Sequence, residues 1–296
     1  MMCRRFGSWT FPLVLLVSLA IGLSAGCAAK KQSWGDPRTG LVLTYRMPED
    51  QSLRYQSTIE QTHSMRGMGG RSRAFDASRT IELSVKSEGT DEENQQLTIT
   101  IDRLEFRLET PRGEMGREVS EIAGKSFEMV LSARGEELSL SGADTVVYDL
   151  GPVGRQNVED MFVTFFPDLA PGPVRVGETW TSTSTTTDKA YSSGAMVNLE
   201  SVNTLEGLET IDGVECVKIT SAIGGTMEGT SADPREIAAV AGAIEGAGVW
   251  YFAYKEGVLV KMTTSVRVTG EMTMGGQQGI PMPMTQETTV ETRLLQ

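Results

Sequence analysis

The feature that most constrains this fold is the alternation of apolar and polar residues, which has a period of two over much of the chain. It is clear in residues 53–60, 80–85 and 97–101, where Leu, Ile, Val and Tyr alternate with Thr, Ser, Glu and Gln. This period places the apolar side chains on one face of a strand. Antiparallel strands with one buried face and one wet face have this pattern. We therefore predict a mainly β fold, a curved antiparallel sheet or half-barrel.

The phase of this alternation changes once within a continuous apolar stretch. Leu97, Ile99 and Ile101 occupy one phase, and Leu104 and Phe106 occupy the other. One extra residue in a strand produces such a change, so we predict a β-bulge near residues 102–103. Turn signals at residues 88–89, 134–135, 212–213 and 255–257 separate the predicted strands.

Two segments depart from the strand pattern. Residues 157–166 carry apolar side chains at helical spacing before Pro167, and this predicts a short amphipathic helix. Asp233, Pro234 and Glu236 fit the first turn of a second helix, which an Ala-rich run would continue to about Gly246. The Gly and Ala content of that run also allows a loose loop.

Two predicted hairpins resemble each other, residues 60–84 and residues 266–290. Each has a centre rich in Met and Gly between two strands. We predict two pseudo-related halves, about 41–150 and 172–296, with the helix at about 157–166 between them. Both halves would close one sheet in a single β-rich domain, residues 41–296.

The N-terminus has the features of an export signal. Arg4 and Arg5 precede an apolar run over residues 11–26, which is shorter than the ~20 residues of a membrane span. The run ends in Leu23-Ser24-Ala25-Gly26-Cys27, which resembles the lipobox of bacterial lipoprotein precursors. That resemblance implies removal of residues 1–26 and acylation of Cys27. Two alternatives are an uncleaved signal anchor and a secreted protein with a Cys27–Cys216 disulfide.

The lipobox also implies a location. Two or more acyl chains anchor a protein stably to a bilayer. Ala28 follows Cys27, and by resemblance to the enterobacterial sorting rule this implies the outer membrane, with the protein facing the periplasm. Residues 27–40 are small and polar and would form a flexible tether.

The charge of the chain argues against two kinds of partner. The formal net charge is -12, and cleavage before Cys27 would leave 25 basic against 39 acidic residues. Such a surface repels nucleic acid and does not favour anionic lipid. The membrane link would therefore come from the acyl chains. With Cys27 acylated, Cys216 has no partner, and we interpret it as a small buried hydrophobe.

A second resemblance covers most of the mature chain. It is carried by Phe166-Pro167, Pro173-Val174, the Val-Gly-Glu-Thr-Trp stretch at residues 176–180, Gly213 with Cys216, and the strands around Gly257. These resemble an uncharacterised family of bacterial envelope lipoproteins, a domain of unknown function. The family implies kinship and no activity. A curved sheet with a helix is also similar to the half-barrel of periplasmic lipoprotein carriers, but fold does not fix function.

The sequence offers little catalytic chemistry. The only histidine, His63, has no surrounding motif, and we predict a surface position for it. Motifs of serine hydrolases, zinc sites, thiol redox sites and calcium loops are absent from the sequence. We expect no catalytic residue, no metal and no cofactor. Six methionines could bind copper(I) or, as we prefer, line adaptable apolar surface: Met65, Met68, Met272, Met274, Met282 and Met284.

Three hypotheses of function follow. The first is a non-catalytic binding module for an apolar ligand or an envelope protein, with these candidate ligand-binding residues: Val158, Met161, Phe162, Phe165 and Trp180. Plain core packing is the alternative interpretation of those residues. The second is a structural or assembly lipoprotein without a small ligand, and the third is a hydrolase that uses carboxylates. A deep cavity would favour the first, a flat apolar patch the second, and two carboxyl groups in one cleft the third.

Overall fold

The computed structural model describes residues 34–49, 51–66, 72–111, 113–150, 155–162, 164–188, 194–230, 237–274 and 280–295. Strands dominate these ranges, and no α-helix occurs in them. The prediction of a mainly β fold is therefore confirmed. The signal peptide, Cys27 and the tether up to residue 33 lie outside the described residues. Residues 34–40, which the predicted tether includes, contribute to a two-stranded sheet of β1 (Gly35–Asp36) and β2 (Gly40–Leu41).

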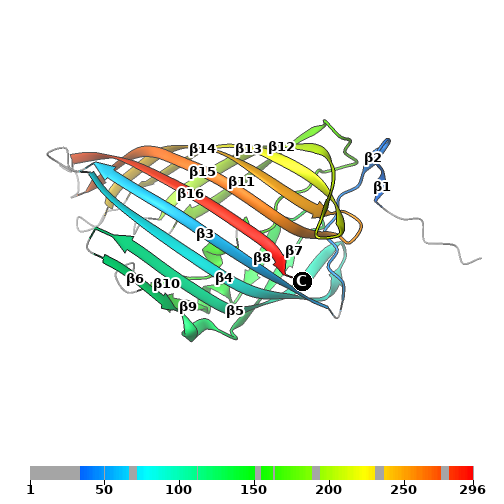
Figure 1. Cartoon of the computed structure of the whole chain (residues 1–296), viewed down its shortest axis with the longest axis horizontal. Helices are drawn as coiled ribbons and strands as arrows, with labels where there is room; N and C mark the ends of the chain where they lie inside the picture. The colour runs from blue at the N-terminus through cyan, green and yellow to red at the C-terminus, as the bar shows by residue number, and fades with distance from the viewer. Residues whose placement is uncertain are drawn as a thin grey trace, which may run out of the picture. The chain divides into compact units, whose positions relative to one another are not determined.

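Twelve strands form one large antiparallel sheet (Figure 1). Its order is β11-β12-β13-β14-β15-β16-β3-β4-β5-β7-β8, and β6 pairs with a further part of β5. The strands are β3 (Ser52–Arg66), β4 (Ser72–Asp91), β5 (Asn94–Thr110), β6 (Gly113–Glu118), β7 (Ser126–Leu131), β8 (Glu137–Ser141), β11 (Thr179–Asp188), β12 (Ala195–Ile211), β13 (Val214–Thr230), β14 (Ile237–Ala253), β15 (Val258–Met274) and β16 (Ile280–Leu295).

Smaller elements join the strands of the large sheet. β9 (Val147–Asp149) and β10 (Arg155–Asn157) form a second two-stranded sheet. The described residues also include three short 3-10 turns, η2 (Ser120–Ile122), η3 (Ala143–Thr145) and η5 (Glu159–Met161).

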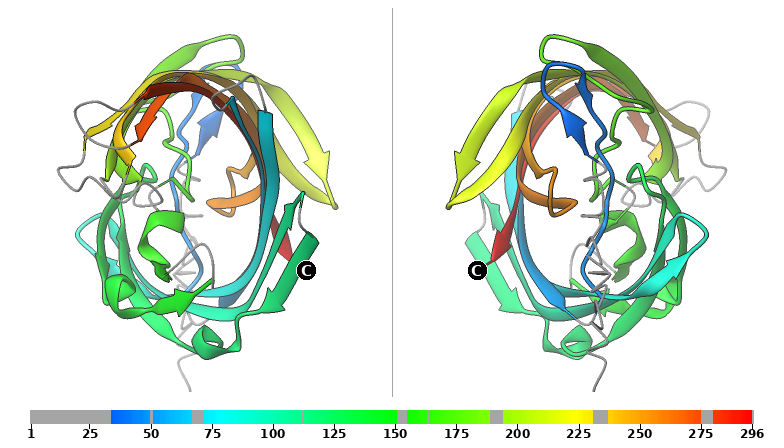
Figure 2. Two further views of the ribbon diagram at one scale, coloured as in Figure 1. Left: turned by 90° about the vertical axis from the view of Figure 1, so that its left-hand side faces the viewer. Right: turned by 90° about the vertical axis from the view of Figure 1, so that its right-hand side faces the viewer.

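The C-terminal strand β16 brings the N-terminal and C-terminal parts of the chain together in the large sheet. It pairs with β15 on one side and with β3 on the other, so the two Met-rich hairpins are neighbours (Figure 1). The end strands β11 and β8 do not pair with each other within the described ranges, so the sheet is curved but not closed (Figure 2). The curved antiparallel sheet is thus confirmed, whereas the pseudo-symmetry of its two halves stays a prediction.

The predicted strand details are mostly confirmed. The register between β4 and β5 skips Asp102, which is the bulge that the phase change indicated. Turns occur at Arg134–Gly135, Asp212–Gly213 and Lys255–Gly257. The turn predicted at residues 88–89 is wrong, because Gly89 lies at a second irregularity inside β4. The chain reverses at Glu92–Glu93 instead, where Glu92 adopts a positive φ of 56°.

The predicted helix at residues 157–166 is wrong. Only η5 is helical there, and its neighbours continue in three-residue turns: the N–H of Met161 donates to Val158 O, that of Phe162 to Glu159 O and that of Phe165 to Phe162 O. Successive turns of this kind also bring residues three apart together, so they produce the same apolar spacing as an α-helix.

The predicted second helix at residues 233–246 is also wrong. Residues 233–236 lie outside the described residues, and the Ala-rich run that follows is part of β14. β14 pairs with β13 on one edge and with β15 on the other. A Cβ atom on Gly246 would lie 2.5 Å from the carbonyl oxygen of Ser265, so the small residues permit close strand packing that overrides helical propensity.

The main core fills one end of the concave face of the sheet, which we call the covered end. Two segments lie over the sheet there, residues 41–47 and residues 158–174, and Figure 2 shows both inside the curve. Tyr45 packs edge-on against Phe166 and Phe252 at 5.6 and 5.1 Å, and Tyr55 packs against Phe165 at 5.8 Å. Aromatic pairs of this geometry add to the hydrophobic burial that holds the segments in place.

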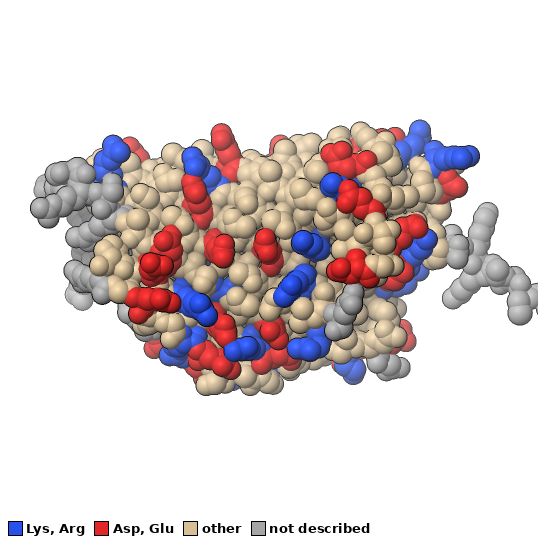
Figure 3. All heavy atoms as spheres, in the orientation of Figure 1, with Lys and Arg blue, Asp and Glu red and all other residues tan. Residues whose placement is uncertain are grey.

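The outer face carries charges of both signs. In Figure 3 acidic and basic side chains alternate over the face formed by β3, β4 and β16. Exposed ion pairs such as Arg54–Glu82 and Lys218–Glu209 form between neighbouring strands. No helix in the described part of the chain has the length and hydropathy needed to span a bilayer.

Candidate functional site

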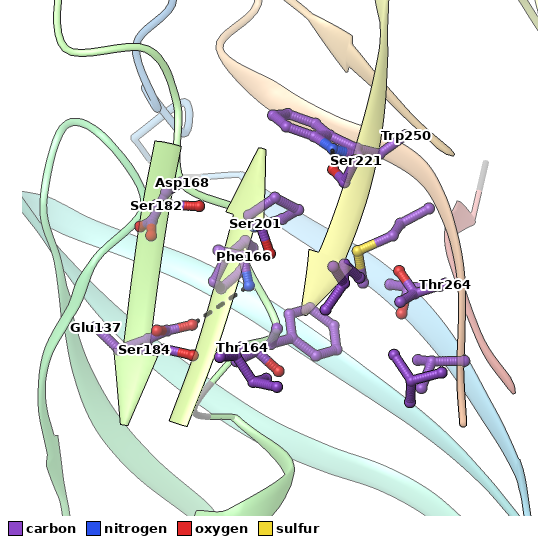
Figure 4. Close-up of a pocket in the computed structure, with 18 of the residues that line it drawn as sticks. Glu137, Thr164, Phe166, Asp168, Ser182, Ser184, Ser201, Ser221, Trp250 and Thr264 are labelled. Atoms are coloured by element: carbon purple, nitrogen blue, oxygen red, sulfur yellow. Dashed lines mark hydrogen bonds between the residues drawn. The ribbon is translucent and has the colours of Figure 1, made fainter. Parts of the chain in front are cut away.

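A cavity of about 520 Å³ lies on the concave face, beside the covered end (Figure 4). Its walls come from β11 to β16, from β3 and β4, and from residues 161–168, which cross the concave face. Four exposed lining residues, Glu136, Thr164, Thr183 and Thr185, lie on this crossing segment, on β11 and just before β8. The cavity therefore opens at the gap between the two end strands of the sheet. Its volume is typical of small-molecule sites.

Two glycines of β14 lie beside the side chains that line this cavity. Along β14 the inward positions alternate, and Gly246 and Gly248 occupy two of them. Gly246 pairs with Ile223 and Val266, and Gly248 pairs with Ser221 and Thr264, and all four of these partners line the cavity. A Cβ atom on Gly246 would lie 2.6 Å from the Val266 side chain, and one on Gly248 would lie 3.1 Å from the Thr264 hydroxyl, so the glycines let these two lining side chains pack closely over β14.

The walls combine apolar and hydroxyl-bearing side chains. The apolar group consists of Ile59, Met161, Phe165, Phe166, Pro167, Leu199, Ile223, Trp250, Met262, Val266 and Val290. The uncharged polar group consists of Ser57, Thr164, Ser182, Thr183, Ser184, Thr185, Ser201, Asn203, Ser221, Thr264 and Thr292. In Figure 4 the labelled hydroxyl residues from β11, β12, β13 and β15 lie around a space beside Phe166. Such a surface binds a ligand that is partly apolar and partly hydrogen-bonding.

Four polar groups in the wall form a directed hydrogen-bond chain across β14, β13, β12 and β11. The Trp250 Nε1–H donates to Ser221 Oγ at 3.0 Å, and Ser221 Oγ–H donates to Asn203 Oδ1 at 2.6 Å. Asn203 Nδ2 donates in turn to Ser182 Oγ at 3.1 Å. Asn203 is only 3% exposed, so these bonds satisfy a buried amide.

A second polar pair lies on the opposite wall. Ser57 and Thr292 face each other across β3 and β16, and their hydroxyl oxygens are 3.0 Å apart. They are 4% and 1% exposed. One hydroxyl of this pair donates to the other, whereas Ser182, Ser184, Ser201 and Thr264 donate to no group among the described residues. Ser182, Ser184, Ser201 and Thr264 are therefore hydroxyl groups of the wall that can donate to a ligand.

The charged groups of the cavity are mostly carboxyls. Glu136, Glu137 and Asp168 line it, with Arg79 as the cation among its described lining residues. Glu137 accepts the backbone N–H of Phe166 at 3.3 Å, which ties the start of β8 to the crossing segment (Figure 4). Burial raises the pKa of Glu137 to about 8, and the nearby Asp168 acts in the same direction. Burial also raises the pKa of Asp168.

A separate apolar cluster lies beyond the cavity, toward the far ends of the long strands. We call it the methionine cluster, and it consists of Ala195, Met227, Val240, Ile244, Val268, Met272 and Met284. Met65, Leu199 and Val266 pack against it. Leu199 and Val266 also line the cavity, so one apolar surface continues from the cavity into the methionine cluster.

The five predicted ligand-binding residues separate into two groups. Met161 and Phe165 line the cavity. Val158 and Phe162 are 0% and 1% exposed and belong to the main core, where the Phe162 ring packs on Phe127 at 4.9 Å. Trp180 is also buried, and its Nε1–H donates to the carbonyl oxygen of Asp168 at 3.0 Å. Only the first two can contact a molecule in this cavity.

Other residues that the sequence singled out lie elsewhere. His63 is not the surface residue we predicted: it is partly buried, its ring stacks on Phe75 at 4.4 Å, and burial lowers its pKa. Cys216 is buried as predicted and is a free thiol, and burial raises its pKa to about 11. In the described ranges no group of three His, Cys, Asp or Glu residues is placed to hold a metal ion. Met65, Met272 and Met284 are part of, or pack against, the methionine cluster, and Met68 lies outside the described residues.

Sequence reasoning missed the hydroxyl residues of the cavity. A signal was present in β12, where the inward positions run Leu199, Ser201, Asn203 and Leu205. Two polar residues inside an otherwise apolar phase indicate either a buried network or a polar cavity. The structure contains both.

Comparisons with known proteins supply no activity. No protein-family model matches the chain, and no curated protein matches it. The resemblance to an envelope-lipoprotein family therefore stays a prediction.

Three crystal structures cover most of the chain at low similarity. They are a candidate exported protein with a YmcC-like fold from Bacteroides fragilis NCTC 9343 (10% identity, 86% of this chain, 99% of that chain, TM-score 0.26), a candidate lipoprotein from Parabacteroides distasonis ATCC 8503 (11%, 86%, 98%, 0.29) and a DUF1329 family protein from Desulfovibrio piger ATCC 29098 (12%, 83%, 87%, 0.16). At these TM-scores we transfer no property from them to this chain.

Proposed function

We propose that this protein is a lipid-anchored envelope protein that binds an apolar ligand in the cavity of its concave face, without catalysing a reaction on it. The single observation that carries the proposal is the cavity of about 520 Å³, which is open at one side and continuous with the methionine cluster. Burial of an apolar molecule there is favourable by roughly 25 cal/mol per Å² of apolar surface removed from water.

The distribution of exposed apolar residues supports a ligand over a structural role. A scaffold would need a flat apolar patch, but the large exposed hydrophobic side chains among the described residues are scattered. Three of them, Met196, Val202 and Leu208, lie on β12. They are six residues apart, which is about 20 Å along a strand, so they form no contiguous surface.

The anchor is proposed from the sequence alone. The basic start, the apolar run and the small residues before Cys27 support acylation of that cysteine. With acyl chains on Cys27, the cavity would act beside a membrane, from which apolar ligands can be taken up or to which they can be delivered.

A carboxylate-based hydrolase is the second candidate. Glu137 and Asp168 line one cavity and both have raised pKa values, as general acids often do. The Glu137 carboxylate, however, accepts the N–H of Phe166, and this bond holds the crossing segment against the start of β8. We therefore favour the binding module.

Native mass spectrometry of the full chain, expressed in a bacterial host and extracted from membranes, tests the proposal. We expect a chain that begins at residue 27, carries acyl groups and retains an apolar molecule. The variant Ile223→Phe fills the cavity and should lose that molecule while staying folded, because the added ring enters unfilled space. Val202→Phe, on the outer face of β12, is the matched control and should keep it.

The two parts of the proposal fail separately. A chain that begins elsewhere contradicts the lipid anchor. A correctly acylated chain without any bound molecule contradicts the binding module, and a stoichiometric second protein in its place supports the scaffold. A bound molecule that is converted to a product, with the conversion lost in Glu137→Gln, supports the hydrolase.

A further inference from the structure

The wall of the cavity contains a chain of hydrogen-bonded polar side chains, which a purely apolar ligand would not require. The indole of Trp250, the hydroxyl of Ser221, the amide of Asn203 and the hydroxyl of Ser182 each donate to the next group in one direction. Each of these groups donates to the next until Ser182, whose hydroxyl donates to no group in the described part of the chain. The chain therefore ends in an unused O–H donor that faces the cavity.

The direction of this chain matters for what it can bind. Hydrogen bonds in series polarise one another, so an O–H group that already accepts a bond is a better donor. Ser201 is the direct partner of Ser182 in the register of β11 and β12, and its hydroxyl also lines the cavity. Two hydroxyls side by side suit an acceptor oxygen of a ligand, such as that of an ester, an amide or an alcohol.

The charges of the cavity argue against an anionic ligand. One arginine, Arg79, lines it together with three carboxyl groups, Glu136, Glu137 and Asp168. An anionic head group would meet these carboxyls with only one cation to offset them. A cationic head group would pair with a carboxylate, but Glu137 already accepts the N–H of Phe166, Asp168 already lies near the cation of Arg134, and Glu136 is exposed to solvent.

The apolar side of the cavity accommodates the rest of such a molecule. Ile223 and Val266 lie in the same cross-strand row as Ser201, on either side of Gly246. Val266 and Leu199 then contact the methionine cluster, where flexible thioether side chains adapt to varied alkyl shapes. The wall thus changes from polar to apolar across the sheet, from Ser182 and Ser201 to Ile223 and Val266, and the apolar part continues along the strands into the methionine cluster.

We propose that the ligand is an uncharged amphiphile, with an ester, amide or hydroxyl oxygen that accepts a hydrogen bond from Ser182 and an alkyl part that lies on Ile223 and Val266 toward the methionine cluster. This inference rests on the proposed binding function. It adds the chemical class of the ligand and the residue that recognises its polar part.

Isothermal titration of the full acylated chain in nanodiscs tests the ligand class, with empty nanodiscs as the blank. Three probes share an eight-carbon chain and differ in the head group: 1-octanoylglycerol is neutral, octanoate is anionic and octyltrimethylammonium is cationic. At pH 7 we expect 1-octanoylglycerol to bind at least ~10-fold more tightly than either charged probe, since a desolvated, poorly paired charge costs more than a factor of ten in affinity.

Three variants test the role of Ser182. Ser182→Ala should weaken binding of 1-octanoylglycerol by ~3- to 10-fold, the usual effect of losing one hydrogen bond. Ser182→Thr keeps the hydroxyl and should stay within ~2-fold of the unmodified protein. Thr181→Ala is the matched control, because the adjacent position on β11 faces outward and is exposed.

The outcomes separate this inference from the function on which it rests. Equal or tighter binding of octanoate or octyltrimethylammonium overturns the uncharged class, and an unchanged affinity in Ser182→Ala overturns the role of that hydroxyl. In both cases the binding function survives. If none of the three probes binds, the binding function itself is contradicted, and the inference with it.

Discussion

The two regions of the concave face use the same strands in opposite ways. At the covered end, residues 41–47 and 158–174 fill the curve with aromatic and aliphatic side chains, and most of these are less than 7% exposed. In the cavity, the same strands present Ser, Thr, Asn and Gly at their inward positions. The difference teaches that one uninterrupted sheet can supply a rigid core and a binding surface when its inward residues change in size and polarity along each strand.

The largest expected effect distinguishes core from cavity directly. Phe162 is 1% exposed and packs on Phe127 and Phe165, so Phe162→Ala should lower the free energy of unfolding by about 3–5 kcal/mol. Val290→Ala, in the cavity wall, should cost only about 1 kcal/mol, because its side chain is partly exposed. Urea denaturation followed by circular dichroism measures both. Equal losses in the two variants would contradict the distinction between the regions.

Glu137 stands at the border of the two regions, and its titration should couple pH to stability. Its pKa in the folded protein is raised from an ordinary value of 4.5 to about 8. The contribution of this group to stability is therefore complete below about pH 4.5 and is lost as the pH rises toward 8. Relative to Glu137→Gln, which keeps an acceptor for the Phe166 N–H, the unmodified protein should lose about 2–4 kcal/mol across this window.

Urea denaturation at a series of pH values between 4 and 9 measures this difference. Glu136→Gln, at the exposed neighbouring position, is the matched control and should follow the unmodified protein. A Glu137→Gln curve that runs parallel to that of the unmodified protein at every pH would mean that Glu137 titrates normally in the folded state.

The sequence predicted the covered end better than the cavity, for a physical reason. Leu97, Ile99 and Ile101 alternate strictly and then shift phase, so the strand and its bulge at Asp102 were predictable from local pattern alone. β14 was missed because Ala and Gly carry no pattern of period two, and only pairing with β13 and β15 makes that segment a strand. The cavity depends on such pairings between distant strands, which no local pattern contains.

In the candidate site, too, local sequence pattern predicted some residues and could not predict others. Met161 and Phe165 were predicted as ligand-binding residues, and they line the cavity, because their segment was recognisably apolar. Ser182, Asn203 and Ser221 come from three different strands and meet only through the register of the sheet. Their hydrogen bonds could not be predicted without that register.

A smaller effect of opposite sign is expected at Tyr148 in the covered end. Its side chain is 2% exposed, and among the described residues its hydroxyl is the buried side-chain polar group without a hydrogen-bond partner. An unsatisfied buried hydroxyl costs about 1–3 kcal/mol. Tyr148→Phe should therefore raise the free energy of unfolding by about 1 kcal/mol, visible as a melting temperature higher by a few degrees.

Tyr55→Phe is the matched control for that variant. The hydroxyl of Tyr55 donates to the carbonyl oxygen of Leu259 at 3.1 Å, so its removal should destabilise the fold. A loss of stability in both variants would show that Tyr148 has a partner after all, and that the covered end is as well satisfied as the polar chain of the cavity.

An effect of similar size but opposite sign is expected at Trp180, which lies between the two regions. Its Nε1–H donates to the carbonyl oxygen of Asp168, and its ring packs edge-on against Trp250 at 6.2 Å. Trp180→Phe keeps an aromatic ring but removes the donor, so it should cost about 1 kcal/mol of unfolding free energy.

Because Trp180 does not line the cavity, the affinity for a neutral amphiphile should stay unchanged in the titration. Ser182→Ala should show the reverse, with affinity reduced and stability retained. A Trp180→Phe variant that loses affinity at full stability would place Trp180 in the binding surface and move the border between core and cavity by one strand position.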